Sequence, residues 1–254
     1  MLLVIDLGNT NLTLGLYEGG KLGARWRLAT DHERMPDEYG LQIIGLLQHA
    51  GFSPDQLEGV CLSSVVPQLT DRLTWACQQY LKQTALVVNS EVKTGLTILY
   101  EDPKAVGSDR IADAVAVRSI YSEPACVVDF GTATTFNAIS AKGEYLGGAI
   151  AAGIGIATAA LSQRAARLPS VSLAAPPSAI GRNTVHAMQS GLLLGYVAMM
   201  EGMVARFRAE LGDDMKVIAT GGFSELIAKE TDQIDLVAPW LTLDGLRLIW
   251  EMNQ

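Results

Sequence analysis

Charged residues, cysteines and long apolar runs are all scarce in this sequence. Asp, Glu, Lys and Arg make up only 18% of the 254 residues, so part of the surface is expected to be buried against a partner chain. The net charge of −8 argues against nucleic acid or an acidic membrane as a partner, because both require a basic face. The three cysteines lack CxxC spacing, which indicates reduced, buried thiols in a reducing compartment.

Signals for export, membrane insertion and zinc binding are also missing. No window approaches the roughly 18 apolar residues of a membrane span. The first residues resemble a signal peptide only superficially, because they lack a basic region and their apolar run stops at Asp6. No two of the three histidines have the i, i+4 spacing of a helical metal site. We therefore expect a cytoplasmic protein, and the 49% of hydrophobic residues can build a substantial core.

Two parts of the sequence share one pattern of strands and turns. Leu2–Ile5 is a short apolar run that leads into Asp-x-Gly at Asp6, and Ala125–Val128 leads into the same motif at Asp129. Further strands and helices follow in each part, which predicts an α/β fold with a mixed sheet in each half. An accidental likeness between two β-hairpins is the alternative. We divide the chain into halves 1–118 and 119–254, with a cleft between them.

Both Asp-x-Gly loops carry groups that can hold phosphate. After Gly8, which permits a sharp turn, residues 9–11 (Asn-Thr-Asn) offer amide and hydroxyl donors to phosphate oxygens. Asp6 could hold hydrated Mg²⁺, which takes one or two carboxylates in addition to phosphates. The loop 129–134 repeats this design with threonine hydroxyls. Either loop alone could be an ordinary β-turn, and the presence of two copies favours a phosphate site.

The motif Gly-Ser-Asp-Arg at residues 107–110 is the best candidate for activating an acceptor hydroxyl. Asp109 stands near the start of an apolar helical segment, where the helix dipole favours a negative charge. The alternative is a capping aspartate next to a solvated arginine. Thr220-Gly221-Gly222 follows a strand and could approach an adenine or ribose closely, although a plain strand-to-helix turn is equally compatible.

Taken together, these motifs resemble type III pantothenate kinases, within the superfamily of actin, the sugar kinases and the Hsp70 ATPase. The resemblance implies two similar actin-like (ribonuclease H-like) halves. It also implies ATP-dependent phosphorylation of (R)-pantothenate to 4′-phosphopantothenate, the first step of coenzyme A biosynthesis. The segments that carry the resemblance are DLGNTN (6–11), SSVVP (63–67), YEDPKAVGSDR (100–110), DFGTATTF (129–136), GRNTVHAMQSGLLLGY (181–196), ATGG (219–222) and LTLDGLR (241–247).

The same resemblance implies a role for particular residues. Asp109 would be the general base, and Arg110 would pair with the substrate carboxylate. Asp129 would ligate a monovalent cation, K⁺ or NH₄⁺. The pantothenate pocket would comprise Tyr100, Gly107, Ser108, Asp109, Arg110 and, from the neighbouring subunit of a homodimer, Thr184. ATP and its Mg²⁺ would be bound by Asp6, Leu7, Gly8, Asn9, Thr10, Asn11, Leu12, Thr13 and Thr132.

Two other functions remain open from the residues alone. One is a kinase of the same superfamily that acts on a sugar or another small hydroxyl compound. The other is a non-catalytic nucleotide-binding regulator of transcription or of a partner protein. The presence of Asp109 beside two complete phosphate loops speaks against the regulator.

Overall fold

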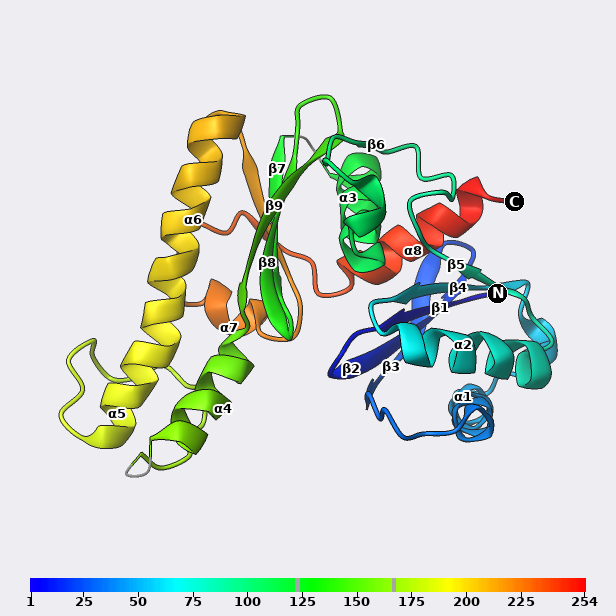
Figure 1. Cartoon of the computed structure of the whole chain (residues 1–254), viewed down its shortest axis with the longest axis horizontal. Helices are drawn as coiled ribbons and strands as arrows, with labels where there is room; N and C mark the ends of the chain where they lie inside the picture. The colour runs from blue at the N-terminus through cyan, green and yellow to red at the C-terminus, as the bar shows by residue number, and fades with distance from the viewer. Residues whose placement is uncertain (122–123, 166–167) are drawn as a thin grey trace. The chain divides into compact units, whose positions relative to one another are not determined.

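A computed structural model describes residues 1–121, 124–165 and 168–254 of the chain. These residues form two compact units, each built on its own mixed sheet (Figure 1). The first unit comprises Met1–Leu96, Glu101–Ser119 and Leu241–Gln254, and the second comprises Thr97–Tyr100 and Ile120–Trp240. Within the described ranges, no helix is long and apolar enough to cross a membrane.

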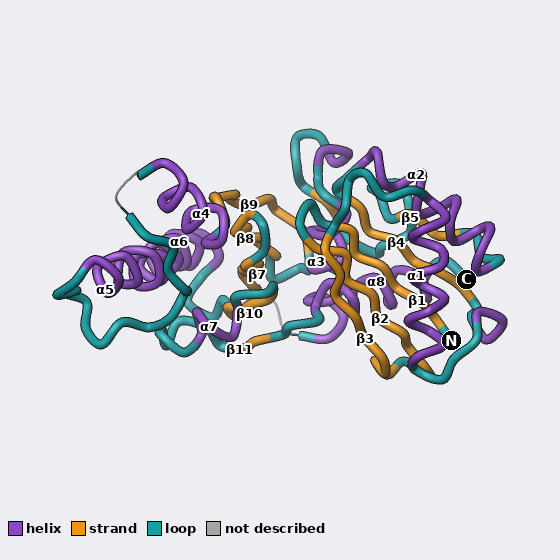
Figure 2. The backbone as a smooth tube through the Cα atoms, turned by 90° about the horizontal axis from the view of Figure 1, so that it is seen from below, coloured by secondary structure: helices purple, strands orange, loops and turns teal. Residues whose placement is uncertain are grey.

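The sheet of the first unit has the strand order β3-β2-β1-β4-β5, which can be followed in Figure 2. β1 pairs antiparallel with β2 and parallel with β4. Because side chains alternate along a strand, Leu3, Ile5 and Leu7 of β1 all point to one face. The strands are β1 (Leu2–Leu7), β2 (Asn11–Glu18), β3 (Lys21–Ala29), β4 (Gly59–Ser64) and β5 (Ala85–Val87).

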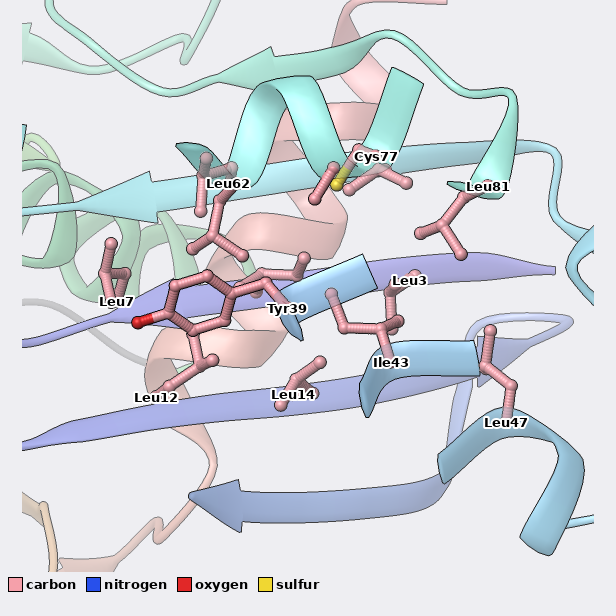
Figure 3. Close-up of a cluster of buried hydrophobic side chains, with 14 of the residues drawn as sticks. Leu3, Leu7, Leu12, Leu14, Tyr39, Ile43, Leu47, Leu62, Cys77 and Leu81 are labelled. Atoms are coloured by element: carbon pink, nitrogen blue, oxygen red, sulfur yellow. The ribbon is translucent and has the colours of Figure 1, made fainter. Parts of the chain in front are cut away.

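Helices cover both faces of this first sheet. On one face, α1 and α2 bury the large apolar cluster that Figure 3 shows around Tyr39. Both helices begin at proline, which suits a first turn because its backbone N–H groups have no partner within the helix. On the other face, Leu243 of α8 packs close to Gly15 and Val4. The helices are α1 (Pro36–His49), α2 (Pro67–Ala76), α3 (Ser108–Ile120) and α8 (Leu241–Met252), with shorter segments η1 (Pro54–Gln56), η2 (Cys77–Leu81) and η3 (Pro103–Ala105).

The sheet of the second unit has the order β11-β10-β7-β8-β9-β6. β7, β8 and β9 are antiparallel neighbours, whereas β10 runs parallel to β7. The short β6 pairs with the edge of β9. The strands are β6 (Thr97–Ile98), β7 (Ala125–Phe130), β8 (Ala133–Ile139), β9 (Glu144–Ala152), β10 (Lys216–Thr220) and β11 (Leu236–Val237).

A long helical segment packs its apolar side chains against this second sheet. It consists of α5 (Thr184–Gln189), the π-helical η4 (Ser190–Leu194) and α6 (Gly195–Leu211). Val197, Met200 and Val204 join Phe130 and Phe136 of the sheet in one buried cluster. The remaining helices of the unit are α4 (Ile154–Arg164) and α7 (Ser224–Ala228).

The two sheets repeat one arrangement of strands. Three antiparallel strands stand beside a parallel one in both, as β3-β2-β1-β4 and as β9-β8-β7-β10. This confirms the predicted α/β fold with two similar halves. The repeat pattern places residues 241–254 with the second half, whereas in the structure they belong to the first unit. They do so because α8 buries Leu241, Leu243, Leu246 and Ile249.

Candidate active site

The first Asp-x-Gly loop is a turn held closed by its own backbone and by Thr30. The Gly8 N–H donates to Asn11 O (2.9 Å), and the Thr30 hydroxyl donates to Gly8 O (2.7 Å). The Thr30 N–H donates to Thr10 O (2.9 Å). Asn9, Thr10 and Asn11 are all exposed on this fixed turn. The loop therefore presents polar side chains to the solvent from a defined backbone.

The leucines on either side of this loop have a different role from its polar residues. The Leu7 and Leu12 side chains are fully buried in the cluster of Figure 3, so only their backbone groups can face a nucleotide. Asp6 and Thr13 are partly buried and lie opposite each other in the β1–β2 pairing. The nucleotide-binding set predicted over residues 6–13 thus contains exposed polar side chains, partly buried polar side chains and two core leucines.

Ser108 fastens the start of α3 to the end of β4. Its Oγ lies 3.0 Å from the Ser63 Oγ, accepts from the Ser64 N–H (2.9 Å) and donates to Ser64 O (3.1 Å). Ser63 is opposite Asp6 in the parallel β1–β4 pairing. The predicted residues 6–13 and 107–110 are therefore brought together within the first unit through Ser63 and Ser64.

Asp109 occupies the first turn of α3. Its Oδ1 accepts the backbone N–H of Arg110 (2.8 Å). Burial raises the pKa of the Asp109 carboxyl above its ordinary value, and the hydrogen bond and charge of Arg110 oppose this rise only in part. A carboxylate with a raised pKa is a stronger base than an exposed one, which suits the removal of a proton from a hydroxyl.

Gly107 and Arg110 restrict the position of the Asp109 carboxylate and its access to a substrate. A β-carbon at Gly107 would lie 2.4 Å from Asp109 Oδ1, so glycine is required for the carboxylate to keep its position. The side chain of Arg110 is buried in the first unit, with 8% of the residue exposed. Only a small part of Arg110 can therefore meet a substrate.

A cavity of about 560 Å³ lies beside this helix start in the first unit. Gly107 and Ser108 line one side of it, and Lys104 and Glu91 form an ion pair of 2.9 Å on another. Both members of that pair are largely exposed, so the pair is a surface feature of the cavity. The cavity is large enough for a small organic acceptor.

Two glycines lie next to the Asp129 carboxylate: Gly131 in the second Asp-x-Gly loop and Gly221 directly after β10. Gly221 has φ +87°, and a β-carbon there would lie 2.2 Å from Asp129 Oδ1. A β-carbon at Gly131 would lie 3.4 Å from Oδ2. Thr132 is held through its carbonyl, which accepts the N–H of Gly153 (3.0 Å). Gly221 of the Thr220-Gly221-Gly222 motif thus leaves room for the Asp129 carboxylate. The position of this motif after a strand did not indicate that role.

Tyr100 lies in the second unit at the edge of its sheet. The backbone of the preceding residue, Leu99, donates to Tyr145 O (2.8 Å). The Tyr100 ring stands 6.4 Å from the Tyr145 ring and close to Gly147, where a β-carbon would lie 3.3 Å from it. Because 39% of Tyr100 is exposed, its ring can meet a ligand.

Thr184 is also in the second unit, at the start of α5. The side chain of Asn183 caps this helix by accepting the His186 N–H (2.9 Å). Thr184 is exposed and lines a cavity of about 670 Å³ together with Arg182 and Asn183. Of the predicted residues, Tyr100, Asp129, Thr132 and Thr184 therefore belong to the second unit.

A protein-only metal centre is absent from the described ranges. No three His, Cys, Asp or Glu side chains there lie close enough together to hold an ion. Asp6 is a single, partly buried carboxylate beside an exposed polar turn. This donor set fits Mg²⁺ that is shared with phosphate oxygens, because that ion needs only one or two carboxylates.

Comparisons with known proteins give one consistent family. A family model described as type III pantothenate kinase matches residues 2–206. A Moorella thermoacetica protein named type III pantothenate kinase is 52% identical over 253 residues, covering 100% of both chains.

Two solved structures share the fold with this chain. A Campylobacter jejuni protein whose name refers to the Baf family of transcriptional activators gives a TM-score of 0.62 at 22% identity, over 99% of this chain and 98% of that one. An inorganic polyphosphate/ATP-glucomannokinase from Arthrobacter sp. strain KM gives 0.50 at 14% identity, over 99% and 97%. At these identities, the likeness concerns the fold alone.

Proposed function

Because the chain belongs to the type III pantothenate kinase family, we propose that it phosphorylates (R)-pantothenate with ATP. The products are 4′-phosphopantothenate and ADP, and the reaction is the first step of coenzyme A biosynthesis. The observation that supports this proposal best is the Asp109 carboxyl at the start of α3, whose pKa is raised by burial. It directly follows Gly107 and Ser108, which line a cavity large enough for a small acceptor.

Asp109 is the residue that we assign to proton transfer. The acceptor hydroxyl oxygen forms a bond to the γ-phosphorus, while the bond from that phosphorus to the β,γ-bridging oxygen breaks and ADP leaves with its electron pair. The hydroxyl proton passes to Asp109. Since Oδ1 already accepts the Arg110 N–H, Oδ2 is the oxygen we assign to the acceptor hydroxyl.

ATP is assigned to the first loop, with Thr132 contributing from the second. The exposed polar groups of Asn9, Thr10 and Asn11 would donate to phosphate oxygens, and Leu7 and Leu12 would contribute only through their backbone. Asp6 would hold the Mg²⁺, which neutralises charge on the phosphates when bound. The remaining members of the set are Gly8 and Thr13.

Pantothenate is assigned to the surroundings of Asp109. Gly107 and Ser108 line the 560 Å³ cavity, and the exposed part of Arg110 would pair with the substrate carboxylate. Tyr100 and Thr184 complete the proposed set, Thr184 coming from the other subunit of a homodimer. The exposed position of Thr184 on a cavity and the low charge of the sequence support that assignment.

Asp129 is assigned to a monovalent cation, K⁺ or NH₄⁺. Its carboxylate oxygens lie next to the backbone of Gly131 and Gly221, where a β-carbon would come within 3.4 Å of Oδ2 and 2.2 Å of Oδ1. We also place the enzyme in the cytoplasm. The three thiols support this compartment because they are free and buried in the structure.

An ADP-release assay on the purified protein tests the function. We expect turnover with pantothenate, little with hexoses, and an increase when K⁺ is added. Hexose-dependent turnover without pantothenate turnover would favour a sugar kinase, the activity that the name of the glucomannokinase describes. ATP binding without turnover of any acceptor would favour a regulator instead.

The oligomer is tested separately by analytical ultracentrifugation. A shared site requires a particle of twice the chain mass at the concentrations used in the assay. A particle with the mass of one chain that is fully active would rule out a contribution of Thr184 from a neighbour.

A further inference from the structure

The helix α8, which contains the LTLDGLR segment, connects two parts of the first unit (Figure 1). One part is the sheet whose strands β1 and β2 carry the first loop. There, the Tyr17 hydroxyl donates to Asp244 Oδ1 (2.7 Å), and the Arg247 guanidinium lies 5.6 Å from the centre of the Tyr17 ring. The other part is α3, whose first turn carries Asp109.

The contact of α8 with α3 contains a buried hydrogen bond. The Thr242 hydroxyl donates to Asp113 Oδ1 (2.7 Å), and Asp113 is only 2% exposed. A carboxylate removed from water must be satisfied by donors of the protein, because an incompletely bonded one is costly. Loss of the Thr242 hydroxyl would therefore favour movement of Asp113, and with it α3, towards solvent.

A second contact fixes the separation of the two helices. A β-carbon at Gly245 would lie 1.9 Å from Ala112 O and 2.5 Å from the Ala112 carbonyl carbon. The helices therefore meet backbone against backbone at this point. Ala112 and Asp113 are neighbours, so the close approach and the hydrogen bond act on the same turn of α3.

Asp109 precedes Asp113 by four residues, so both project from one face of α3. Ser108 fastens the start of the helix to β4, and Asp113 fastens the next turn to α8. Asp109 lies between these two attachments. A rotation or slide of α3 that is allowed by loss of either attachment would displace its carboxylate.

We propose that Thr242 is a positioning residue for phosphoryl transfer. Through Asp113, and with the close contact at Gly245, it holds Asp109 in a fixed place relative to the first loop. This inference rests on the proposed role of Asp109 as the base. It gives the LTLDGLR segment a function in the chemical step, although the segment contains none of the assigned substrate contacts.

The test compares Thr242→Val, which keeps the shape of the side chain without its hydroxyl, with Thr242→Ser, which keeps the hydroxyl. We expect Thr242→Val to lower kcat about tenfold while KM for ATP changes by less than about twofold, because a displaced base affects the chemical step and not ATP binding. Thr242→Ser is expected to stay within about twofold of wild type in kcat. Glu251→Gln is the control, since it removes an ion pair with Arg247 on the same helix and leaves both partners of the Thr242–Asp113 hydrogen bond unchanged.

Hydrogen exchange provides a second measurement that needs no substrate. Backbone amides of residues 109–113 should exchange faster in Thr242→Val than in wild type, Thr242→Ser or Glu251→Gln. Wild-type exchange and kcat in Thr242→Val would overturn the proposal, as would an equal loss of kcat in the valine and serine variants. A wild-type protein without pantothenate turnover would instead refute the proposed function, and the exchange data would still decide whether Thr242 holds α3.

Discussion

The hydroxyl oxygens of Ser63 and Ser108 lie 3.0 Å apart inside the first unit, and both residues are buried. Ser63 stands opposite Asp6 in the β1–β4 pairing, and Ser108 is the first residue of α3. This contact therefore links the strand end assigned to the metal and nucleotide to the helix start assigned to the acceptor. We therefore expect substitutions at Ser63 or Ser108 to affect catalysis.

Replacement of Ser108 by alanine should weaken both stability and activity. The Ser64 N–H would lose its acceptor in a partly buried place, which costs about 1 kcal/mol of unfolding free energy. Denaturant unfolding followed by circular dichroism measures that loss. Ser178→Ala is the matched control, because Ser178 lies in an exposed loop; equal losses in the two variants would refute the linking role of Ser108.

Asp109→Asn should abolish most of the turnover without preventing nucleotide binding. The amide cannot accept the hydroxyl proton, so we expect kcat to fall by at least about 100-fold. Calorimetric titration with ATP and Mg²⁺ should give a dissociation constant close to that of wild type. If the variant turned over pantothenate near the wild-type rate, the general base would have to be a different residue.

The raised pKa of Asp109 predicts a particular dependence of stability on pH. A carboxyl whose folded-state pKa is raised favours folding at low pH, and this contribution is lost as pH rises through the folded pKa. At neutral pH the buried charge is therefore unfavourable, and Asp109→Asn should be more stable than wild type. The difference should shrink as pH falls below the ordinary range of Asp; a difference that grows on acidification would contradict the direction of the shift.

Gly221→Ala should displace the Asp129 carboxylate in addition to straining the backbone. Gly221 and Gly212 both have positive φ, +87° and +100°, but only at Gly221 would a β-carbon meet other atoms, among them Asp129 Oδ1. Both variants carry backbone strain of about 1–3 kcal/mol, because a β-carbon disfavours positive φ at either position. Only Gly221→Ala should also weaken activation by K⁺, measured by titrating K⁺ in the ADP-release assay. Equal K⁺ responses in both variants would argue against a cation at Asp129.

The three cysteines should resist alkylation in the folded protein. Burial raises the pKa of each thiol to about 12, so very little thiolate is present at pH 8. Mass spectrometry after iodoacetamide treatment should find unmodified native protein and three labels after denaturation. Rapid labelling of Cys61, Cys77 or Cys126 in the native state would show that its surroundings open more readily than the structure implies.

The features that could be predicted from the sequence are those set by neighbouring residues. Asp-x-Gly after an apolar run defines a strand and a turn, and both loops were correctly placed between antiparallel strands. The same alternation also places Leu7 with Leu3 and Ile5 on the core face, so the burial of its side chain was available from the pattern.

The features that could not be predicted depend on contacts between distant segments. No neighbouring residue distinguishes Gly245 from any other helical glycine. Glycine is needed there because the Ala112 carbonyl, which is distant in the sequence, leaves no room for a β-carbon. The spacing of apolar residues over 241–252 is typical of an amphipathic helix with one buried face, but it does not indicate which sheet that face covers. The partners of Ser108 likewise follow from the β4–α3 contact, although Ser63 and Ser64 lie in a segment that carries the family resemblance.

The placement of α8 has a consequence for the order in which this protein can fold during synthesis. The first unit requires residues 241–254, which the ribosome adds after the whole second unit. The second unit needs only residues up to Trp240, so it can form its core while the first sheet still lacks the helix on one of its faces. Until α8 emerges, Val4 and Gly15 on that face are without Leu243, and the nascent chain exposes an apolar surface that is prone to aggregation.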